Sequence, residues 1–331
     1  MMEPFDPLDP AAHDRWDADA ASGENIGIDP WCSRPTWALA VNGAFSTDAD
    51  PGPPIGLESE LGQAVFASLR ADDGTTVLAP LDRVWGFGSC IIPSRDAPTR
   101  DLLDDTVAAL LARSDWRICA LSGMVEHSPI DEAVVEAFGR HLPLYAGASR
   151  TRCQASLAGG VDGYLSRRAR EHRRNVRQAE RRANSAGVIY DVADDHPPER
   201  MIRRLHAVET ESWKGREGSG IEANEMARLY ERLIGDLGRR NAVRCVFAQL
   251  PSGADVGFIL GGVLGDTYRG LQVSFIEESR GLSVGNLLQW HEVQRMCTEN
   301  LRTYDLGMDI DYKRRWAENE MTTRTVFAVR R

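Results

Sequence analysis

Lysine is almost absent from this chain. Of its 39 lysine and arginine residues only two are lysine, Lys214 and Lys313. Both stand in polar and aromatic clusters, Glu211-Ser-Trp-Lys-Gly-Arg216 and Asp309-Ile-Asp-Tyr-Lys-Arg-Arg-Trp316. A lysine ammonium is a compact point charge on a flexible stem, which a planar guanidinium does not replace. The two lysines therefore have either a functional role or an ordinary place in surface ion pairs.

Other signatures are also missing. None of the six cysteines forms a Cys-x-x-Cys pair, and the seven histidines show no metal-binding spacing, so no disulfide framework and no metal site is expected. The sequence has no Gly-x-Ser-x-Gly elbow and no P-loop. No apolar run is long enough for a membrane-spanning helix. The acidic start does not resemble a secretory signal, so we expect a cytoplasmic location.

The charge is strongly uneven along the chain. The net charge of -10 argues against a general nucleic-acid-binding surface. The first sixty residues hold twelve acidic and two basic side chains. By contrast, residues 167–182 hold eight arginines against Glu171 and Glu180. An anionic partner is expected to bind this basic stretch.

Two halves of the sequence repeat one order of predicted elements. The first half has strands and helices in the order hairpin, strand, helix, strand, helix, at residues 64–70, 75–81, 84–92, 102–113, 116–122 and 129–141. The second half has three strands, a helix and two further strands, at residues 243–250, 256–264, 268–276, 283–299, 302–306 and 322–329. We expect an acidic segment at 1–28 and two α/β domains at 29–150 and 151–331.

The basic stretch predicts an amphipathic helix at residues 161–186. Its apolar positions recur every three or four residues and form one stripe: Leu165, Ala169, His172, Val176, Ala179 and Ala183. Gly187 suits the C-terminal end of a helix. We expect this helix to join the two domains. It is either a solvated packing helix or an electropositive wall for an anionic substrate or for nucleotide phosphates.

A strand, a glycine-containing loop and a long apolar helix follow one another at residues 274–288. The N-terminus of such a helix presents unpaired N–H groups to an anion. Gly281 and Gly285 allow a ligand to approach the backbone closely. This arrangement indicates an anion site, although many folds contain it.

This segment resembles the acyl-CoA pyrophosphate loop of the GNAT acyltransferase superfamily, Arg/Gln-x-x-Gly-x-Gly/Ala. Arg280 and Gly285 fall in register, and Ser283 stands where the first glycine is expected. The arginine-rich helix, the Ser-Trp-Lys-Gly stretch and the Tyr-Lys-x-x-Trp ending resemble the FemAB-like/CelD-like branch in the same order. The resemblance covers about residues 160–331. It implies an α/β (α+β) fold of tandem GNAT-like units, each a mixed, mostly antiparallel sheet flanked by helices, joined by the arginine-rich helix.

The resemblance also implies an activity. The chain is expected to be an N-acyltransferase that moves an acyl group from acetyl-CoA or another acyl-CoA to a small-molecule or peptide amine. The alternatives are a FemAB-type transferase that uses aminoacyl-tRNA, which alone would bring in nucleic acid, and a non-catalytic binding protein. The residues expected to bind the carrier are Val273, Phe275, Ile276, Arg280, Gly281, Ser283, Val284, Gly285 and Asn286.

Direct attack by an amine needs a proton acceptor, an oxyanion stabiliser and a proton for the leaving thiolate. Asp311 or Glu211 is the expected base, with Asp309 as a further candidate, and Tyr312 the expected acid. Each carboxylate could equally be structural: Glu211 at a helix end, Asp311 as a helix N-cap. The residues expected to bind substrate are Trp213, Lys214, Arg216, Lys313 and Trp316. We also expect the two lysines to face one cleft.

Overall fold

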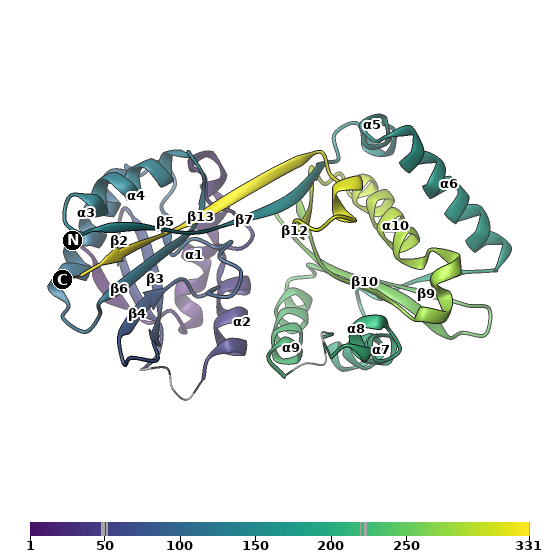
Figure 1. The fold of residues 1–331 in the computed structure, drawn as a ribbon, viewed down its shortest axis with the longest axis horizontal. Helices are drawn as coiled ribbons and strands as arrows, with labels where there is room; N and C mark the ends of the chain where they lie inside the picture. The colour runs from purple at the N-terminus through teal and green to yellow at the C-terminus, as the bar shows by residue number, and fades with distance from the viewer. Residues whose placement is uncertain (48–49, 51, 219, 222–223, 331) are drawn as a thin grey trace. The chain divides into compact units, whose positions relative to one another are not determined.

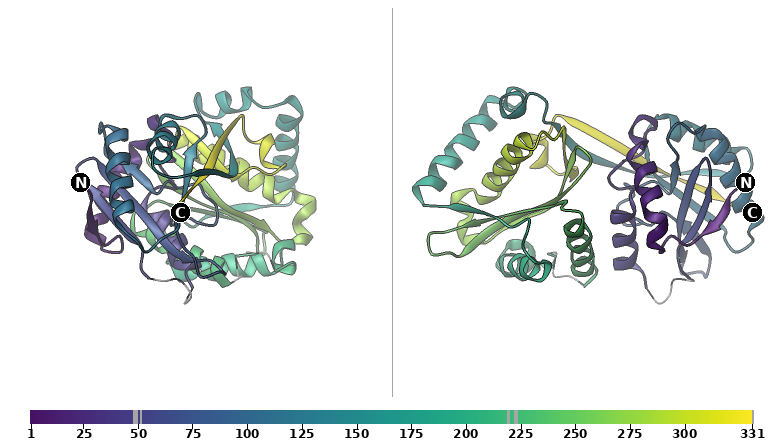
Figure 2. Two further views of the ribbon diagram at one scale, coloured as in Figure 1. Left: turned by 60° about the vertical axis from the view of Figure 1, so that its left-hand side comes forward. Right: turned by 180° about the vertical axis from the view of Figure 1, so that it is seen from behind.

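The computed structural model describes residues 1–47, 50, 52–218, 220–221 and 224–330. The chain divides into two compact units, which Figures 1 and 2 show from three directions. The first unit comprises Met1–Thr151 and Thr322–Arg331, and the second comprises Arg152–Met321. Two long strands, β7 (Leu144–Ser156) and β13 (Asn319–Val329), belong partly to each unit.

The first unit is a mixed sheet with helices. Its strands follow the order β1-β2-β3-β4-β6-β13-β7, and β5 pairs with β3. Only the short β4–β6 pairing is parallel among the registers of its described strands. The elements are β1 (Glu3–Phe5), η1 (Pro10–Ala12), α1 (His13–Ala21), η2 (Gly23–Ile26), α2 (Pro35–Phe45), β2 (Ile55–Ser59), β3 (Gly62–Arg70), β4 (Thr76–Ala79), β5 (Ile91–Pro93), α3 (Thr99–Ala112), β6 (Ile118–Val125) and α4 (Pro129–Gly139).

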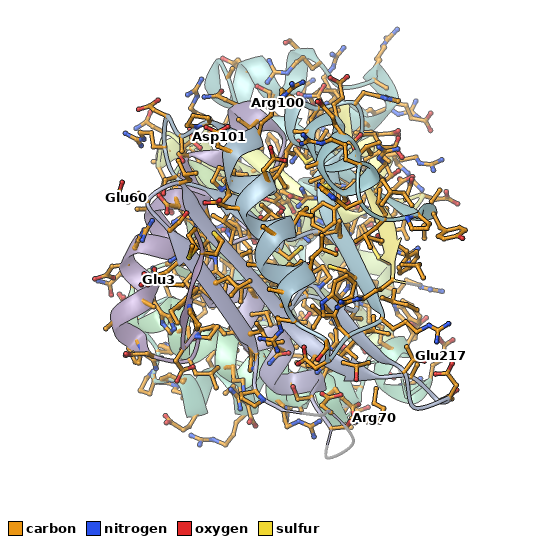
Figure 3. All side chains as sticks on the ribbon, turned by 90° about the vertical axis from the view of Figure 1, so that its left-hand side faces the viewer. Glu3, Glu60, Arg70, Arg100, Asp101 and Glu217 are labelled. Carbon is orange, nitrogen blue, oxygen red and sulfur yellow. The ribbon has the colours of Figure 1, made fainter. Side chains whose placement is uncertain are left out.

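The acidic N-terminal stretch is part of this unit, and the expectation of a separate segment is wrong. Trp16 of α1 is 1 % exposed, and Met2, Ala20 and Ile28 lie in the same apolar core as β3 and α3. Burying these apolar side chains is favourable and outweighs the repulsion between the many surface carboxylates. Charged side chains such as Arg100 and Asp101 remain outside, as Figure 3 shows.

The second unit is the better predicted half. Its strands follow the order β7-β12-β11-β10-β9-β8. Helices α10 and α6 cover one face of the sheet, and α7 to α9 cover the other (Figure 1). The elements are α5 (Gly160–Ser166), α6 (Arg170–Ser185), β8 (Ile189–Val192), α7 (Pro198–Thr210), α8 (Trp213–Arg216), α9 (Asn224–Arg239), β9 (Val243–Gln249), β10 (Asp255–Leu264), β11 (Thr267–Phe275), η3 (Glu277–Leu282), α10 (Val284–Thr298), β12 (Thr303–Met308) and η4 (Lys313–Arg315).

The predicted fold class, mixed and mostly antiparallel sheets flanked by helices, is confirmed. Two details differ. The predicted helix at 161–186 is two helices, because Ala169 takes an extended backbone conformation between α5 and α6. Both helices lie inside the second unit, so it is the strands β7 and β13, and not the arginine helix, that join the units. No described helix has the length and apolarity needed to cross a membrane.

The helix α10 packs closely on β10 at Gly257, and this contact yields a prediction. A Cβ on Gly257 would lie 2.6 Å from Val284 Cγ1 and 3.0 Å from the Ser274 carbonyl oxygen. We expect Gly257→Ala to lower the free energy of unfolding by about 1–3 kcal/mol, because overpacking strains the core.

Urea unfolding measures the free energy of unfolding of Gly257→Ala and wild type. Gly238→Ala on α9 is the matched control. No atom lies within 4 Å of a Cβ there, so alanine should be neutral or stabilise the helix by up to about 1 kcal/mol. Equal stabilities of Gly257→Ala and wild type would contradict the packing.

Candidate active site

Two neighbouring parallel strands of the second unit, β11 and β12, part after a short pairing. Their register in the described chain consists of the pairs Thr267↔Thr303, Tyr268↔Tyr304 and Arg269↔Asp305. Each strand carries a β-bulge just beyond the last pair: the β10–β11 register skips Leu271, and the β12–β7 register skips Leu306. A bulge bends the strand that carries it. The two strands therefore diverge directly after Arg269 and Asp305.

A buried ion triad lies at this point of divergence. The Asp305 carboxylate accepts hydrogen bonds from Arg152 at 2.8 Å, from Arg269 at 2.7 Å and from the Gly307 N–H at 2.8 Å. The three charged side chains are at most 4 % exposed. Burial alone would raise the pKa of Asp305, but the two guanidiniums and the N–H outweigh it and hold the pKa below its usual value.

Lys313 lies next to this triad. Its Nζ is 3.5 Å from the place that a Cβ on Gly307 would take. Desolvation lowers the pKa of Lys313 to about 8; Arg269 adds to this effect and Asp305 opposes it. An ammonium with so low a pKa is easily discharged, and it gains from any anion that comes beside it.

Lys214 reaches the same region from α8. Its Nζ donates to the Val273 carbonyl of β11 at 2.8 Å. Desolvation lowers its pKa, and the charge of Glu209 opposes the shift. Lys214 is also one of the charges that lower the pKa of Lys313. The charges of the two lysines therefore act on each other, and both ammonium groups are partly desolvated.

The edge of β11 that faces away from β10 is partly covered, because Ser212 forms an isolated antiparallel bridge with Ile276 there. The Ile276 N–H donates to Val256 of β10 at 3.0 Å. Because neighbouring residues of a strand face opposite edges, Val273 and Phe275 direct their N–H groups away from β10. The N–H of Ile276, which was expected to serve the carrier, is thus used within the sheet.

A buried carboxylate lies beside β11. Glu209, in the last turn of α7, is 0 % exposed. Its Oε1 accepts hydrogen bonds from the Gln272 side chain at 3.0 Å and the Ile221 N–H at 3.3 Å. Its Oε2 is buried and has no hydrogen-bond partner among the residues that the structure describes. Glu209 therefore combines burial with one unused acceptor.

The loop before α10 has the conformation that an anion site requires. Ser283 adopts a left-handed conformation with φ of 61°, and its hydroxyl accepts from Arg182 of α6 at 2.9 Å. Gly285 is needed because a Cβ there would come 3.0 Å from the Phe275 ring. Arg280 is 70 % exposed. Arg182 thus contacts the residue that precedes α10, while Arg280 pairs with Glu277 at 3.2 Å, and the first N–H groups of the helix can receive an anion.

The other residues of this loop have different surroundings. Val284 is fully buried in the core between α10 and the sheet. Apart from its chain neighbours, no described residue has an atom within 4 Å of a Cβ built on Gly281, so the backbone there is open to a ligand. Asn286, the residue after Gly285 in α10, lines a pocket.

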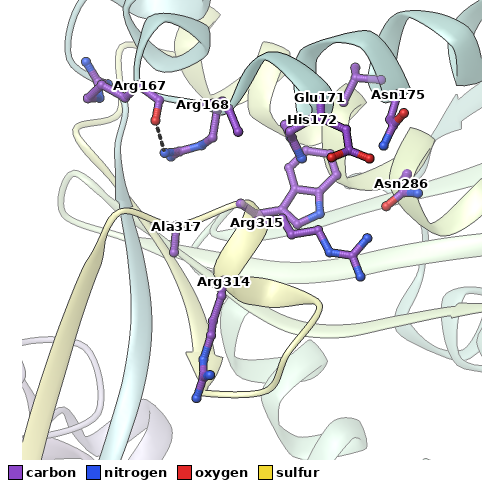
Figure 4. A pocket seen from close by; sticks show the side chains of 12 residues that line it. Arg167, Arg168, Glu171, His172, Asn175, Asn286, Arg314, Arg315 and Ala317 are labelled. Atoms are coloured by element: carbon purple, nitrogen blue, oxygen red, sulfur yellow. Dashed lines mark hydrogen bonds between the residues drawn. The ribbon is translucent and has the colours of Figure 1, made fainter.

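This pocket has a volume of about 380 Å³ and a basic lining. Side chains from α6, η4 and the start of α10 surround it (Figure 4). Desolvation, together with the charges of Arg168 and Arg315, lowers the pKa of His172 to about 4, so this ring is neutral at physiological pH. The polar residues that line the pocket are Arg167, Arg168, Glu171, His172, Asn175, Asn286, Arg314 and Arg315. Such a lining suits an anionic ligand.

The carboxylates expected to act as the base are either exposed or paired with an arginine. The Asp311 side chain is 100 % exposed, and that of Glu211 is 62 % exposed. Asp309 forms a two-bond ion pair with Arg314 at 2.6 and 2.8 Å. Hydrogen bonds from Arg314 and from the Cys153 thiol lower the pKa of Asp309 to about 2, which makes it a weak base. Two of the three are thus exposed, and the third is held by Arg314 although the charge of Lys313 acts on it.

The aromatic candidates divide into two groups. Trp213 and Tyr312 are 43 % and 42 % exposed, beside Lys214 and Lys313. Desolvation raises the pKa of Tyr312 to about 12, so its hydroxyl keeps its proton. Trp316 is a core residue, 1 % exposed and edge-on to His172. Arg216, half exposed, pairs with Glu278.

Sequence reasoning missed four residues of the site: Arg152, Glu209, Arg269 and Asp305. Arg269 and Asp305 had a signal, because each is a charged residue in a predicted strand, directly after a tyrosine. A charge at such a position is buried only when it is paired. Glu209 had no such signal in the sequence. It is buried and Glu211 is exposed only because α7 ends between them.

Residues 170–314 match the family described as an Acetyltransferase (GNAT) domain. No curated protein matches the sequence. The described residues contain no group of His, Cys, Asp and Glu side chains that could hold a metal ion.

Three solved structures resemble almost the whole chain. The crystal structure of FemX is 11 % identical with a TM-score of 0.67, over 98 % of this chain and 96 % of that one. L-PGS from Bacillus licheniformis is 13 % identical with a TM-score of 0.56, over 99 % and 94 %. A conserved protein of unknown function from Bacteroides thetaiotaomicron VPI-5482 is 9 % identical with a TM-score of 0.64, over the full length of both. At these identities the likeness shows the fold. The chain thus shares the fold of these structures, and its residues 170–314 match an acetyltransferase (GNAT) domain.

Proposed function

We propose that the second unit is an N-acyltransferase that moves an acyl group from acetyl-CoA or another acyl-CoA to an amine. The observation that carries this proposal is the gap between β11 and β12. Lys214 donates to the Val273 carbonyl of β11, Lys313 lies beside Gly307 of β12, and α10 begins a short loop after β11 ends. An acyl-CoA has an anionic end and an electrophilic carbonyl, and the first N–H groups of α10 and the ammonium groups of the two lysines can bind both.

The anionic part of the carrier binds at the start of α10. The first N–H groups of the helix receive the phosphates, with Arg182 and Arg280 on either side. The basic pocket around Arg168 and Arg315 adjoins Asn286 and holds further negative charge. The pantetheine arm then runs along the outward N–H groups of Val273 and Phe275.

The carbonyl of the acyl group lies between the two lysines. As the amine attacks, negative charge develops on the carbonyl oxygen, and the Lys313 ammonium stabilises it in a partly desolvated site. Lys214 is already oriented by its bond to Val273 and supports the same charge or binds an anionic group of the acceptor. The Tyr312 hydroxyl, protonated up to about pH 12, supplies a proton to the leaving thiolate.

A second function, transfer from aminoacyl-tRNA, has one observation in its favour. Arg170, Arg174, Arg177 and Arg181 follow a spacing of four, three and four along α6, and all are exposed. None of them forms an ion pair with a described residue. A row of guanidiniums on one helix face suits the phosphates of a nucleic acid.

Exchange of the lysines for arginine tests the leading function. We expect Lys214→Arg and Lys313→Arg each to lower kcat/KM for transfer from acetyl-CoA by about 10-fold or more, with the melting temperature unchanged, because a guanidinium cannot take the place of a point charge. The inverse exchange Arg200→Lys, on the exposed face of α7, is the control. Wild-type rates in both lysine variants would contradict the assignment.

The pH dependence gives a further test. A step that needs the positive charge of Lys313 slows as pH rises through about 8, where this ammonium loses its proton. In Lys313→Arg the charge persists, so this falling limb should move beyond about pH 10 although the maximum rate is lower. The measurement is kcat/KM against pH, with an acceptor amine that titrates outside this range. An unchanged falling limb in Lys313→Arg would assign it to another group.

The salt dependence of transfer and substitutions in the arginine row of α6 distinguish the two classes of acyl donor. We expect transfer from acetyl-CoA and no transfer from charged tRNA. The double variant Arg174→Gln/Arg177→Gln should transfer from acetyl-CoA within about 2-fold of wild type. Transfer from charged tRNA alone would establish the second function instead. Binding of the tRNA should then depend steeply on salt, and the double variant should reduce the slope of this dependence by the equivalent of about two phosphate contacts.

A further inference from the structure

The second unit holds two deeply buried carboxylates near the gap, and they differ in how their oxygens are used. Asp305 is saturated by two guanidiniums and the Gly307 N–H. Glu209 uses only Oε1, while the buried Oε2 has no hydrogen bond within the described chain. A buried oxygen of a carboxylate without a partner is costly, so an unused acceptor of this kind marks a place where a ligand proton fits.

The contacts of Glu209 place it beside the bulge of β11. Its Oε1 is held by Gln272, the residue directly after the bulge of β11. Its charge acts on Lys214 of α8 and on Tyr230 of α9, and Arg269 of β11 acts on Tyr230 as well. The Tyr230 hydroxyl donates to the carbonyl of the bulge residue Leu271 at 3.1 Å. Charged groups from three elements thus meet beside the start of the gap.

We propose that Glu209, and not Glu211 or Asp311, accepts the proton of the acceptor amine; this inference rests on the proposed function. The acceptor arrives as an ammonium and gives one proton to Oε2. Its nitrogen then forms the C–N bond to the acyl carbon, and the C–S bond breaks with its electron pair on sulfur. The thiolate takes the Tyr312 proton, and the second proton of the nitrogen restores Tyr312. Glu209 releases its proton to solvent, so the products are an amide, a free thiol and one proton.

The geometry also fixes the most informative substitution. In Glu209→Gln the amide oxygen can keep both hydrogen bonds of Oε1, from Gln272 and Ile221, while the amide nitrogen replaces Oε2 and cannot take a proton. The fold around Gly220, where a Cβ would come 2.8 Å from Glu209 Cγ, is thereby preserved. The matched control is Glu199→Gln, an exposed glutamate at the start of the same helix.

The experiment measures kcat/KM against pH for wild type, Glu209→Gln, Glu211→Gln and Glu199→Gln, with acetyl-CoA and one amine acceptor. We expect Glu209→Gln to lose about 100-fold or more and to lose the rising limb at low pH that the carboxylate produces. Glu199→Gln should match wild type. Glu209→Asp keeps a carboxylate, so it should retain the rising limb at a lower maximum rate. This variant tests the role of Glu209 if the glutamine variant does not fold.

The outcomes separate the two proposals. A wild-type pH profile in folded Glu209→Gln, or loss of the rising limb in Glu211→Gln, would overturn the role of Glu209 while the acyltransferase function stands. Loss of the limb in Glu209→Asp would assign a structural role. A wild-type protein that transfers no acyl group from acetyl-CoA would overturn both.

Discussion

The second unit depends on the buried carboxylate of Asp305, which ties β12 to β7 through Arg152 and to β11 through Arg269. Two guanidiniums buried beside one carboxylate are tolerable only as a complete set, and loss of the carboxylate would cost roughly 3–5 kcal/mol. The triad holds three strands together at the last residue pair before two bulges turn β11 and β12 apart. The gap that follows is therefore a feature fixed by the core and not a loose edge.

The charge at this point explains the two lysines. Four cations, Arg152, Arg269, Lys214 and Lys313, stand against the two carboxylates of Asp305 and Glu209. Desolvation, with the charge of Arg269 as a further cause, lowers the pKa of Lys313, and the excess of positive charge favours any developing negative charge. An arginine could not be discharged in this way, because its guanidinium keeps its proton throughout the physiological pH range. The two exceptions to the use of arginine therefore lie where a compact and responsive charge has a chemical purpose.

Much of the second unit was predictable, because its elements are strongly periodic. The strands β9 to β12 and the helix α10 lie within a few residues of the predicted ranges. The long strand β7 was missed, since its residues 144–151 are mixed and partly exposed, and β13 was assigned to the wrong unit, since long-range pairing leaves no local signal. The break at Ala169 was missed because alanine favours a helix and only tertiary packing overrides it. Among the site residues, burial decided between Glu209 and Glu211, and burial is not visible in two glutamates two positions apart.

The central claim is that the acyl donor lies in the gap between β11 and β12. A crystal structure with a non-hydrolysable acyl-CoA analogue tests it most directly. We expect the pyrophosphate at the N–H groups of Val284 and Gly285, and the acyl carbonyl oxygen within hydrogen-bond distance of Lys313 Nζ. An analogue bound in the first unit, or bound in the second unit with its acyl end outside the gap, would contradict it.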